Sequence, residues 1–155
     1  MSEPRSTKKG VLMDLLDKIN WWQDSVEVLT FLFDKWHPRN CKNEKDYENS
    51  LYSFLIKKLK GHQITKQYAI GRFRADLVID NKLIIEIKYN LNTPGKYRSL
   101  LGQLAEYKQW GGRIILILVG KTDPDLRERL SSYLEKEGFY ATYFFERDKV
   151  TVYEK

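Results

Sequence analysis

The feature that most constrains the fold is a pair of short apolar segments, residues 75–79 and 83–87, joined by Asp80-Asn81-Lys82. Both segments contain β-branched residues, which are typical of strands. Asp and Asn tolerate the left-handed backbone that tight hairpin turns require. The stretch therefore predicts a β-hairpin with a three-residue loop, in which Ile79 pairs with Leu83.

This register also predicts which side chains share a face of the first strand. Successive side chains of a strand point to opposite faces of the sheet. We therefore expect Asp76 to share a face with Val78, and Ala75 to share the other face with Leu77 and Ile79. A carboxylate is thus expected among apolar neighbours.

Three charged side chains are expected to meet on that face. Counting back from the loop places Asp76 directly opposite Glu86, and Lys88 lies two residues further along the second strand. Two carboxylates that face each other destabilise a strand pair, and half-buried carboxylates need partners. A divalent cation such as Mg²⁺, which prefers carboxylate oxygens, resolves the conflict. The alternative is that Lys88 neutralises one carboxylate and solvent accommodates the other.

The rest of the chain predicts a mixed sheet flanked by helices. The polar residues 1–10 predict a disordered tail. Apolar residues at helical spacing then predict one broken or two consecutive helices over residues 11–36. Further helices are expected over residues 44–60, 96–110 and 124–137, and further strands over residues 63–70, 113–119, 139–145 and 149–153. From residue 44 on, the order α-β-β-β-α-β-α-β-β indicates an α/β fold, and the length favours one domain over residues 11–155.

Asp76, nine intervening residues and Glu86-Ile87-Lys88 together resemble the signature of the PD-(D/E)xK nuclease superfamily. The proline that often precedes the aspartate is replaced here by Ala75. The resemblance implies a metal-dependent nuclease with the restriction-endonuclease-like α-β-β-β-α-β core. That core would span residues 44–120, after a helical extension at residues 11–38 and before a C-terminal helix and strands at residues 121–155.

Three further residues extend the resemblance. Glu48 lies in the helix before the three strands, where many members of the superfamily have a glutamate that completes the metal site. Gln103 and Tyr107 share one face of the helix after the hairpin, and Gln103-x-x-x-Tyr107 resembles a motif of RecB-type nucleases. The resemblance to this branch implies that both residues support the active site and the DNA.

The resemblance also implies a role for each site residue. Asp76, Glu86 and the main-chain carbonyl of Ile87 would bind Mg²⁺, for which Mn²⁺ can substitute. Glu48 would bind through water or hold a second ion. Lys88 would orient or deprotonate the attacking water, because the field of the cation lowers the pKa of its ammonium group.

The charge of the chain favours a polyanionic partner. Its formal net charge is +6 and its pI is near 9.3, which is compatible with DNA binding. Arg72 and Arg74 precede the first carboxylate, in the position of phosphate clamps. The other candidate DNA-backbone contacts lie on the two helices that flank the hairpin: Lys57, Lys58, Lys60, Lys96, Arg98 and Lys108.

Several classes of protein are disfavoured. Cys41 is the only cysteine, which excludes an intrachain disulfide and a four-cysteine iron–sulfur cluster. The longest apolar run, residues 114–119, is far shorter than the roughly 20 residues of a membrane span. The N-terminal residues do not resemble a signal peptide, so we expect a cytoplasmic protein without a membrane partner. His37 and His62 have no ligand spacing and receive no role.

Three alternatives to a simple DNA nuclease stay open at this point. A Holliday-junction resolvase would need a homodimer, because two nicks are placed by two-fold symmetry. A non-catalytic nucleic-acid-binding protein could keep the same fold. A partner-dependent subunit could use the aromatic-rich residues 11–36 as a docking surface.

Overall fold

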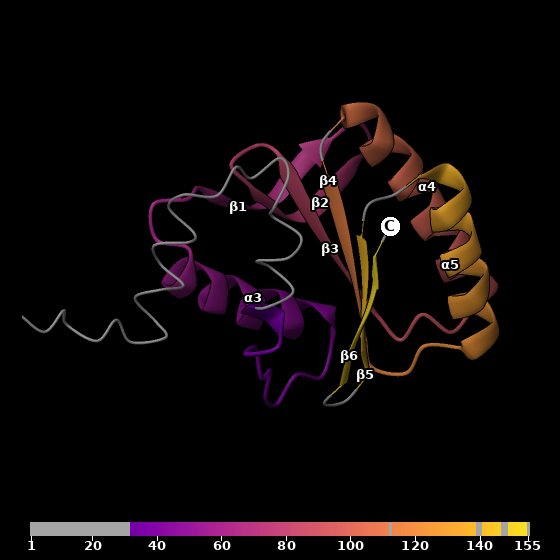
Figure 1. Cartoon of the computed structure of the whole chain (residues 1–155), viewed down its shortest axis with the longest axis horizontal. Coiled ribbons are helices and arrows are strands. Elements are labelled where there is room, and N and C mark those ends of the chain that lie inside the picture. Colours follow the sequence, from indigo (N-terminus) through magenta and orange to yellow (C-terminus); the bar gives the residue numbers. More distant parts are fainter. Residues whose placement is uncertain (1–31, 112, 139–140, 147–148, 155) are drawn as a thin grey trace, which may run out of the picture.

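The computed structural model describes residues 32–111, 113–138, 141–146 and 149–154, with side chains up to residue 138 (Figure 1). The helices are α3 (Glu44–Lys58), α4 (Pro94–Trp110) and α5 (Pro124–Glu137). The strands are β1 (Ile64–Ile70), β2 (Phe73–Ile79), β3 (Leu83–Tyr89), β4 (Arg113–Val119), β5 (Ala141–Glu146) and β6 (Lys149–Glu154). The predicted tail at residues 1–10 and the predicted helices up to residue 31 lie outside the described residues. None of the described helices is long and apolar enough to span a membrane.

The six strands form one mixed sheet in the order β1-β2-β3-β4-β5-β6. Strands β1, β2 and β3 are antiparallel neighbours, β3, β4 and β5 run parallel, and β6 is antiparallel to β5. Helix α3 lies on one side of the sheet, and α4 and α5 lie on the other (Figure 1). The predicted α/β class, the mixed sheet flanked by helices and the α-β-β-β-α-β order are confirmed.

The β2–β3 hairpin has the predicted register. Asp80 and Asn81 both have left-handed backbone, with φ of 53° and 56°. The N–H of Lys82 donates to the Ile79 carbonyl at 3.0 Å, which closes the turn. Ile79 pairs with Leu83, so the loop has three residues and the pairing that follows from it places Asp76 at the level of Glu86.

Two apolar cores fill the space between the sheet and its helices. Strand β4 contributes to both, because Ile115, Ile117 and Val119 pack on the α3 side while the alternate residues pack under α4 and α5. The α3-side core also contains three buried residues that precede α3: Leu32, Phe33 and Trp36. The C-terminal end of the predicted helical extension therefore packs in the core.

Strands β1 and β2 exchange faces near Asp76. The prediction that Ala75 shares a face with Leu77 is wrong, because Ala75 packs in the α4-side core and Leu77 packs in the α3-side core. Ladder pairs lie on both sides of Gln67 and Asp76, so these two residues face each other. Gln67 has φ of 53°, and this left-handed residue breaks the alternation on which the prediction relied.

Candidate active site

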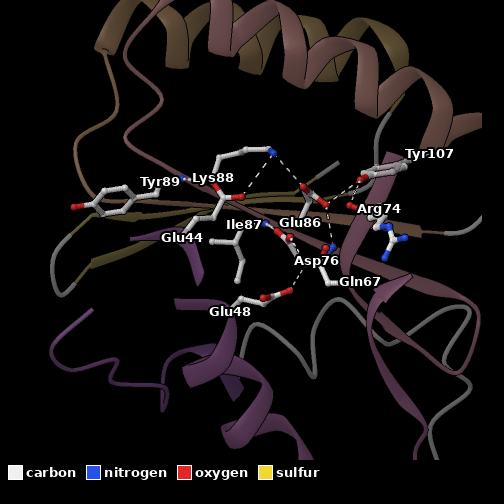
Figure 2. Close-up of polar contacts among 10 residues, drawn as sticks. All are labelled: Glu44, Glu48, Gln67, Arg74, Asp76, Glu86, Ile87, Lys88, Tyr89 and Tyr107. Atoms are coloured by element: carbon white, nitrogen blue, oxygen red, sulfur yellow. Dashed lines mark hydrogen bonds and ion pairs between the residues drawn. The ribbon is translucent and has the colours of Figure 1, made fainter. Parts of the chain in front are cut away.

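The candidate site lies where the β2–β3 ladder opens. The ladder runs from the hairpin turn to the pair Leu77–Ile85 and includes no further pair. At the next position the N–H of Asp76 donates to Glu86 Oε2 at 3.2 Å, and the N–H of Ile87 donates to Asp76 Oδ2 at 2.8 Å. Side-chain carboxylates thus accept hydrogen bonds from N–H groups of the neighbouring strand (Figure 2). Asp76 and Glu86 lie opposite each other as predicted, and their carboxylates are close together.

Glu86 is held from two directions. Its side chain is buried. Lys88 Nζ lies 3.1 Å from Oε1, and the hydroxyl of Tyr107 lies 3.1 Å from Oε2 (Figure 2). The same hydroxyl lies 3.1 Å from the carbonyl of Arg74. Tyr107 therefore links α4 to both hairpin strands at the site.

Helix α3 brings two more carboxylates to the site. Its first turn is fixed by Asn43, whose side chain accepts a hydrogen bond from the Asp46 N–H at 2.8 Å as an N-cap. This start places Glu44 in the first turn, where the helix dipole favours an acid. Glu48 lies four residues later on the same face.

The two glutamates of α3 differ in their distance from the hairpin carboxylates. Glu44 offers an oxygen that lies, with oxygens of Asp76 and Glu86, in a group whose members are all within 4.8 Å of one another. Glu48 is fully buried, and it contacts Lys45 Nζ at 2.7 Å and the side-chain amide of Gln67. Glu48 thus reaches Asp76 through Gln67, whose Nε2 lies 3.3 Å from Asp76 Oδ1.

Burial raises the proton affinity of both hairpin carboxylates. Burial and the neighbouring Glu86 raise the pKa of Asp76 from 3.8 to about 8. Burial also raises the pKa of Glu86, although Lys88 opposes this effect. Burial alone lowers the pKa of Lys88, but the carboxylates of Glu86 and Glu44 outweigh it and raise that pKa overall. With the protein's own groups alone, Lys88 is therefore an ammonium at neutral pH.

The donor set fits a hard divalent cation. Three carboxylates that converge within 4.8 Å supply the oxygen ligands that Mg²⁺, Mn²⁺ and Ca²⁺ prefer. Burial first, and then the charge of Glu86, raise the pKa of Asp76, and Lys88 offsets only part of this rise. A bound cation would offset the remainder. Ile87 reaches the site through its N–H, and its carbonyl as a ligand stays a prediction.

The predicted supporting pair is only partly joined to the site. Tyr107 contacts Glu86 directly. Gln103 lies one turn earlier on α4, and its Oε1 is buried without a hydrogen-bond partner among the residues that the structure describes. A role for Gln103 in supporting the site stays a prediction.

The candidate DNA-binding residues are spread over the surface. Arg72 and Arg74 are exposed beside the site, and Arg72 lies 3.8 Å from Glu106. Lys57 is at the far end of α3, roughly 14 Å along the axis from Glu48 at 1.5 Å per residue, and Lys58 and Lys60 lie beyond it. Lys108 Nζ lies 2.7 Å from the carbonyl of Glu137 and 3.1 Å from its carboxylate.

Lys96 and Arg98 are in the first two turns of α4. Lys96 lines a pocket of about 190 Å³ that also contains Lys88 and Glu44. The other lining residues are Tyr89, Leu91, Ser99 and Leu100. The pocket gives a small ligand access to the Lys88 side of the site.

The sequence interpretation missed Glu44 and Gln67. Glu44 precedes Glu48 by one helical turn, so the helix face that contains Glu48 already pointed to it. Gln67 could have been found from the register, because the β1–β2 ladder sets it opposite Asp76. Its left-handed backbone has no local signal in the sequence.

No protein-family model and no curated protein sequence matches the chain. Among solved structures, it is similar to the one described as the structure of Pyrococcus furiosus SfsA in complex with Ca²⁺. The two share 13% sequence identity with a TM-score of 0.40, over 71% of this chain and 61% of that one. This chain therefore matches less than two thirds of that protein's length, and a likeness at this level carries no argument about function.

Proposed function

We propose that the protein is a divalent-metal-dependent nuclease that hydrolyses phosphodiester bonds in DNA. The observation that carries the proposal is the convergence of Glu44, Asp76 and Glu86 within 4.8 Å, with Lys88 3.1 Å from Glu86. Carboxylates around a cation, with a lysine beside them, form a combination suited to phosphodiester hydrolysis. The resemblance of residues 76–88 to the PD-(D/E)xK signature supports the same activity.

Each residue of the site has a proposed role. Asp76, Glu86 and Glu44 hold the cation, with Mg²⁺ as the expected ion and Mn²⁺ as a substitute. When bound, the cation polarises a phosphoryl oxygen and stabilises charge on the leaving oxygen. Lys88 is partly exposed next to Glu86, so its ammonium can donate a hydrogen bond to a phosphate oxygen or to the attacking water. Tyr107 keeps Glu86 in place through its hydroxyl.

The surroundings of Lys88 suit a phosphate group. The pocket beside it carries the ammonium groups of Lys88 and Lys96. Lys96 Nζ donates a hydrogen bond to the carbonyl of Asn90 at 3.1 Å, which restrains this side chain of the pocket lining. Contacts of this kind position a nucleic-acid backbone without reading its sequence, so we expect cleavage with little sequence preference.

The test is cleavage of labelled DNA with Mg²⁺, with Mn²⁺ or with EDTA. The substrates are linear duplex, single-stranded and four-way junction DNA. We expect metal-dependent cutting that Glu86→Ala and Lys88→Ala abolish, while DNA binding is largely retained. The control Glu128→Ala, which removes an exposed carboxylate of α5, should cut like the wild type.

The outcomes separate the remaining alternatives. Paired nicks in the junction by a dimer would identify a resolvase. Binding without cutting by well-folded wild-type protein would favour a non-catalytic role, and cutting only after addition of a second protein would favour a partner-dependent subunit. Full cleavage by purified Lys88→Ala would refute the role of that lysine.

A further inference from the structure

Gln67 has an unusual backbone for its place in the fold. It lies in the middle of β1, between the ladder pairs Lys66–Leu77 and Tyr68–Ala75. Its φ of 53° is in the left-handed region, which is uncommon for a residue other than Gly and costs free energy. Such strain persists only where other interactions of the residue compensate for it.

The strained backbone changes the direction of the Gln67 side chain. Ile64 packs in the α3-side core, so strict alternation would send residue 67 to the opposite side of the sheet. The amide of Gln67 instead reaches Glu48 of α3. The left-handed residue therefore brings an amide to carboxylates that a regular strand would not present to it.

The amide lies between two of the site's carboxylates (Figure 2). Its Nε2 hydrogen-bonds Oε1 of Glu48 and is 3.3 Å from Oδ1 of Asp76. An amide nitrogen has two hydrogens and can donate one to each acceptor. The other oxygen of Asp76 accepts the N–H of Ile87. Both oxygens of Asp76 thus have a fixed donor, which sets the plane of this carboxylate.

We propose that Gln67 is the positioning residue of the metal site. Its amide links Asp76 to Glu48 and thereby fixes the orientation of the Asp76 carboxylate. The remaining lone pairs of that carboxylate then face the cation. This inference rests on the proposed metal-dependent function, since it assumes that Asp76 is a ligand. Groups that orient a ligand are typically worth about 10- to 100-fold in metal affinity or activity.

The test separates the side chain from the backbone. Gln67→Gly removes the amide, and Gly adopts positive φ without steric cost. We expect its melting temperature in EDTA to be equal to that of the wild type or higher. Its dissociation constant for Mn²⁺, measured by electron paramagnetic resonance, should rise about 10- to 100-fold, and the Mg²⁺ concentration for half-maximal cleavage should rise with it.

A matched control places glycine at another position of β1. Ala69 is exposed and pairs with Arg74, so Ala69→Gly weakens the strand without removing a site contact. It should lower the melting temperature and leave Mn²⁺ affinity unchanged. Gln67→Asn keeps an amide and tolerates the left-handed backbone, but it is one methylene shorter, and it should also bind Mn²⁺ more weakly than the wild type.

The outcomes distinguish this inference from the proposed function. Wild-type Mn²⁺ affinity in Gln67→Gly or in Gln67→Asn overturns the positioning role. Wild-type protein that binds Mn²⁺ but cuts no DNA refutes the nuclease, while the affinities of the variants still decide the role of Gln67. Wild-type protein that binds no Mn²⁺ overturns both.

Discussion

The buried carboxylate of Asp76 predicts that the protein loses stability as pH rises when no metal is present. The side chain is 7% exposed, and its pKa is raised from 3.8 to about 8 by burial and by Glu86. A group whose pKa is raised by folding favours the folded state fully below its unfolded pKa. This contribution is lost as pH rises through the folded value. The window therefore runs from about pH 4 to about pH 8.

The magnitude follows from the size of the shift. Each pKa unit corresponds to about 1.4 kcal/mol, so the shift of Asp76 from 3.8 to about 8 is worth roughly 6 kcal/mol across the full window as an upper limit. Typical domains have a free energy of unfolding of about 5–15 kcal/mol, so the loss is a large fraction of the total. Asp76→Asn keeps the shape of the side chain but cannot ionise, and it should remove most of this pH dependence.

The assay is urea unfolding at pH 5 and at pH 8.5 in EDTA. Wild-type protein should lose several kcal/mol between the two pH values, and Asp76→Asn should lose much less. Every other group of the protein is common to the two variants, so the comparison isolates the contribution of Asp76. Glu128→Gln, an exposed carboxylate on α5, should behave like the wild type.

Metal provides the second half of this test. A cation binds the ionised form of the carboxylate, and it binds only in the folded protein. Saturating Mg²⁺ should therefore abolish the loss in free energy of unfolding at pH 8.5. Binding should release protons near neutral pH, and apparent affinity should rise with pH. An equal dependence of the free energy of unfolding on pH in wild type and Asp76→Asn would refute the prediction that ionised Asp76 destabilises the metal-free protein.

Further predictions concern residues around this pair. Tyr107→Phe removes a hydroxyl that lies 3.1 Å from both Glu86 Oε2 and the Arg74 carbonyl. Thermal unfolding should therefore show a loss of about 1–3 kcal/mol in the free energy of unfolding, and the cleavage rate should fall about tenfold. Glu44→Gln should weaken Mn²⁺ binding more than Glu48→Gln in calorimetry, because only Glu44 lies in the close carboxylate group; the opposite ranking would restore Glu48 as the ligand. Lys96→Ala should remove one phosphate contact and so reduce the slope of log DNA affinity against log salt concentration by about 1. The ammonium group of Lys108 contacts Glu137 of α5, so Lys108→Ala should leave this slope unchanged.

The hairpin could be predicted because its determinants are local. The turn residues Asp80 and Asn81 adopt the left-handed backbone that their chemistry allows, and the loop length then fixes Ile79 opposite Leu83. The opposition of Asp76 and Glu86 follows from that pairing.

The sequence does not predict which glutamate of α3 joins the hairpin carboxylates, because this depends on how the helix packs on the sheet. Glu44 and Glu48 share a helix face, and the sequence pattern does not say which of them approaches Asp76. The packing of α3 in the core decides it, through residues such as Leu51 and Leu55. The family resemblance favours Glu48, whereas in the structure Glu44 lies in the close carboxylate group.

The rule of alternation fails at the position where the site is built. Strands β1 and β2 exchange faces at Gln67 and Asp76, and the β2–β3 ladder stops beyond Leu77. A regular sheet would keep the carboxylates of α3 and the hydroxyl of Tyr107 on opposite sides, separated by the strands. The exchange of faces and the opening of the ladder let groups from both sides meet at one point. Local departures from regular structure are expected where a sequence serves function rather than folding, and here the departure is what creates the site.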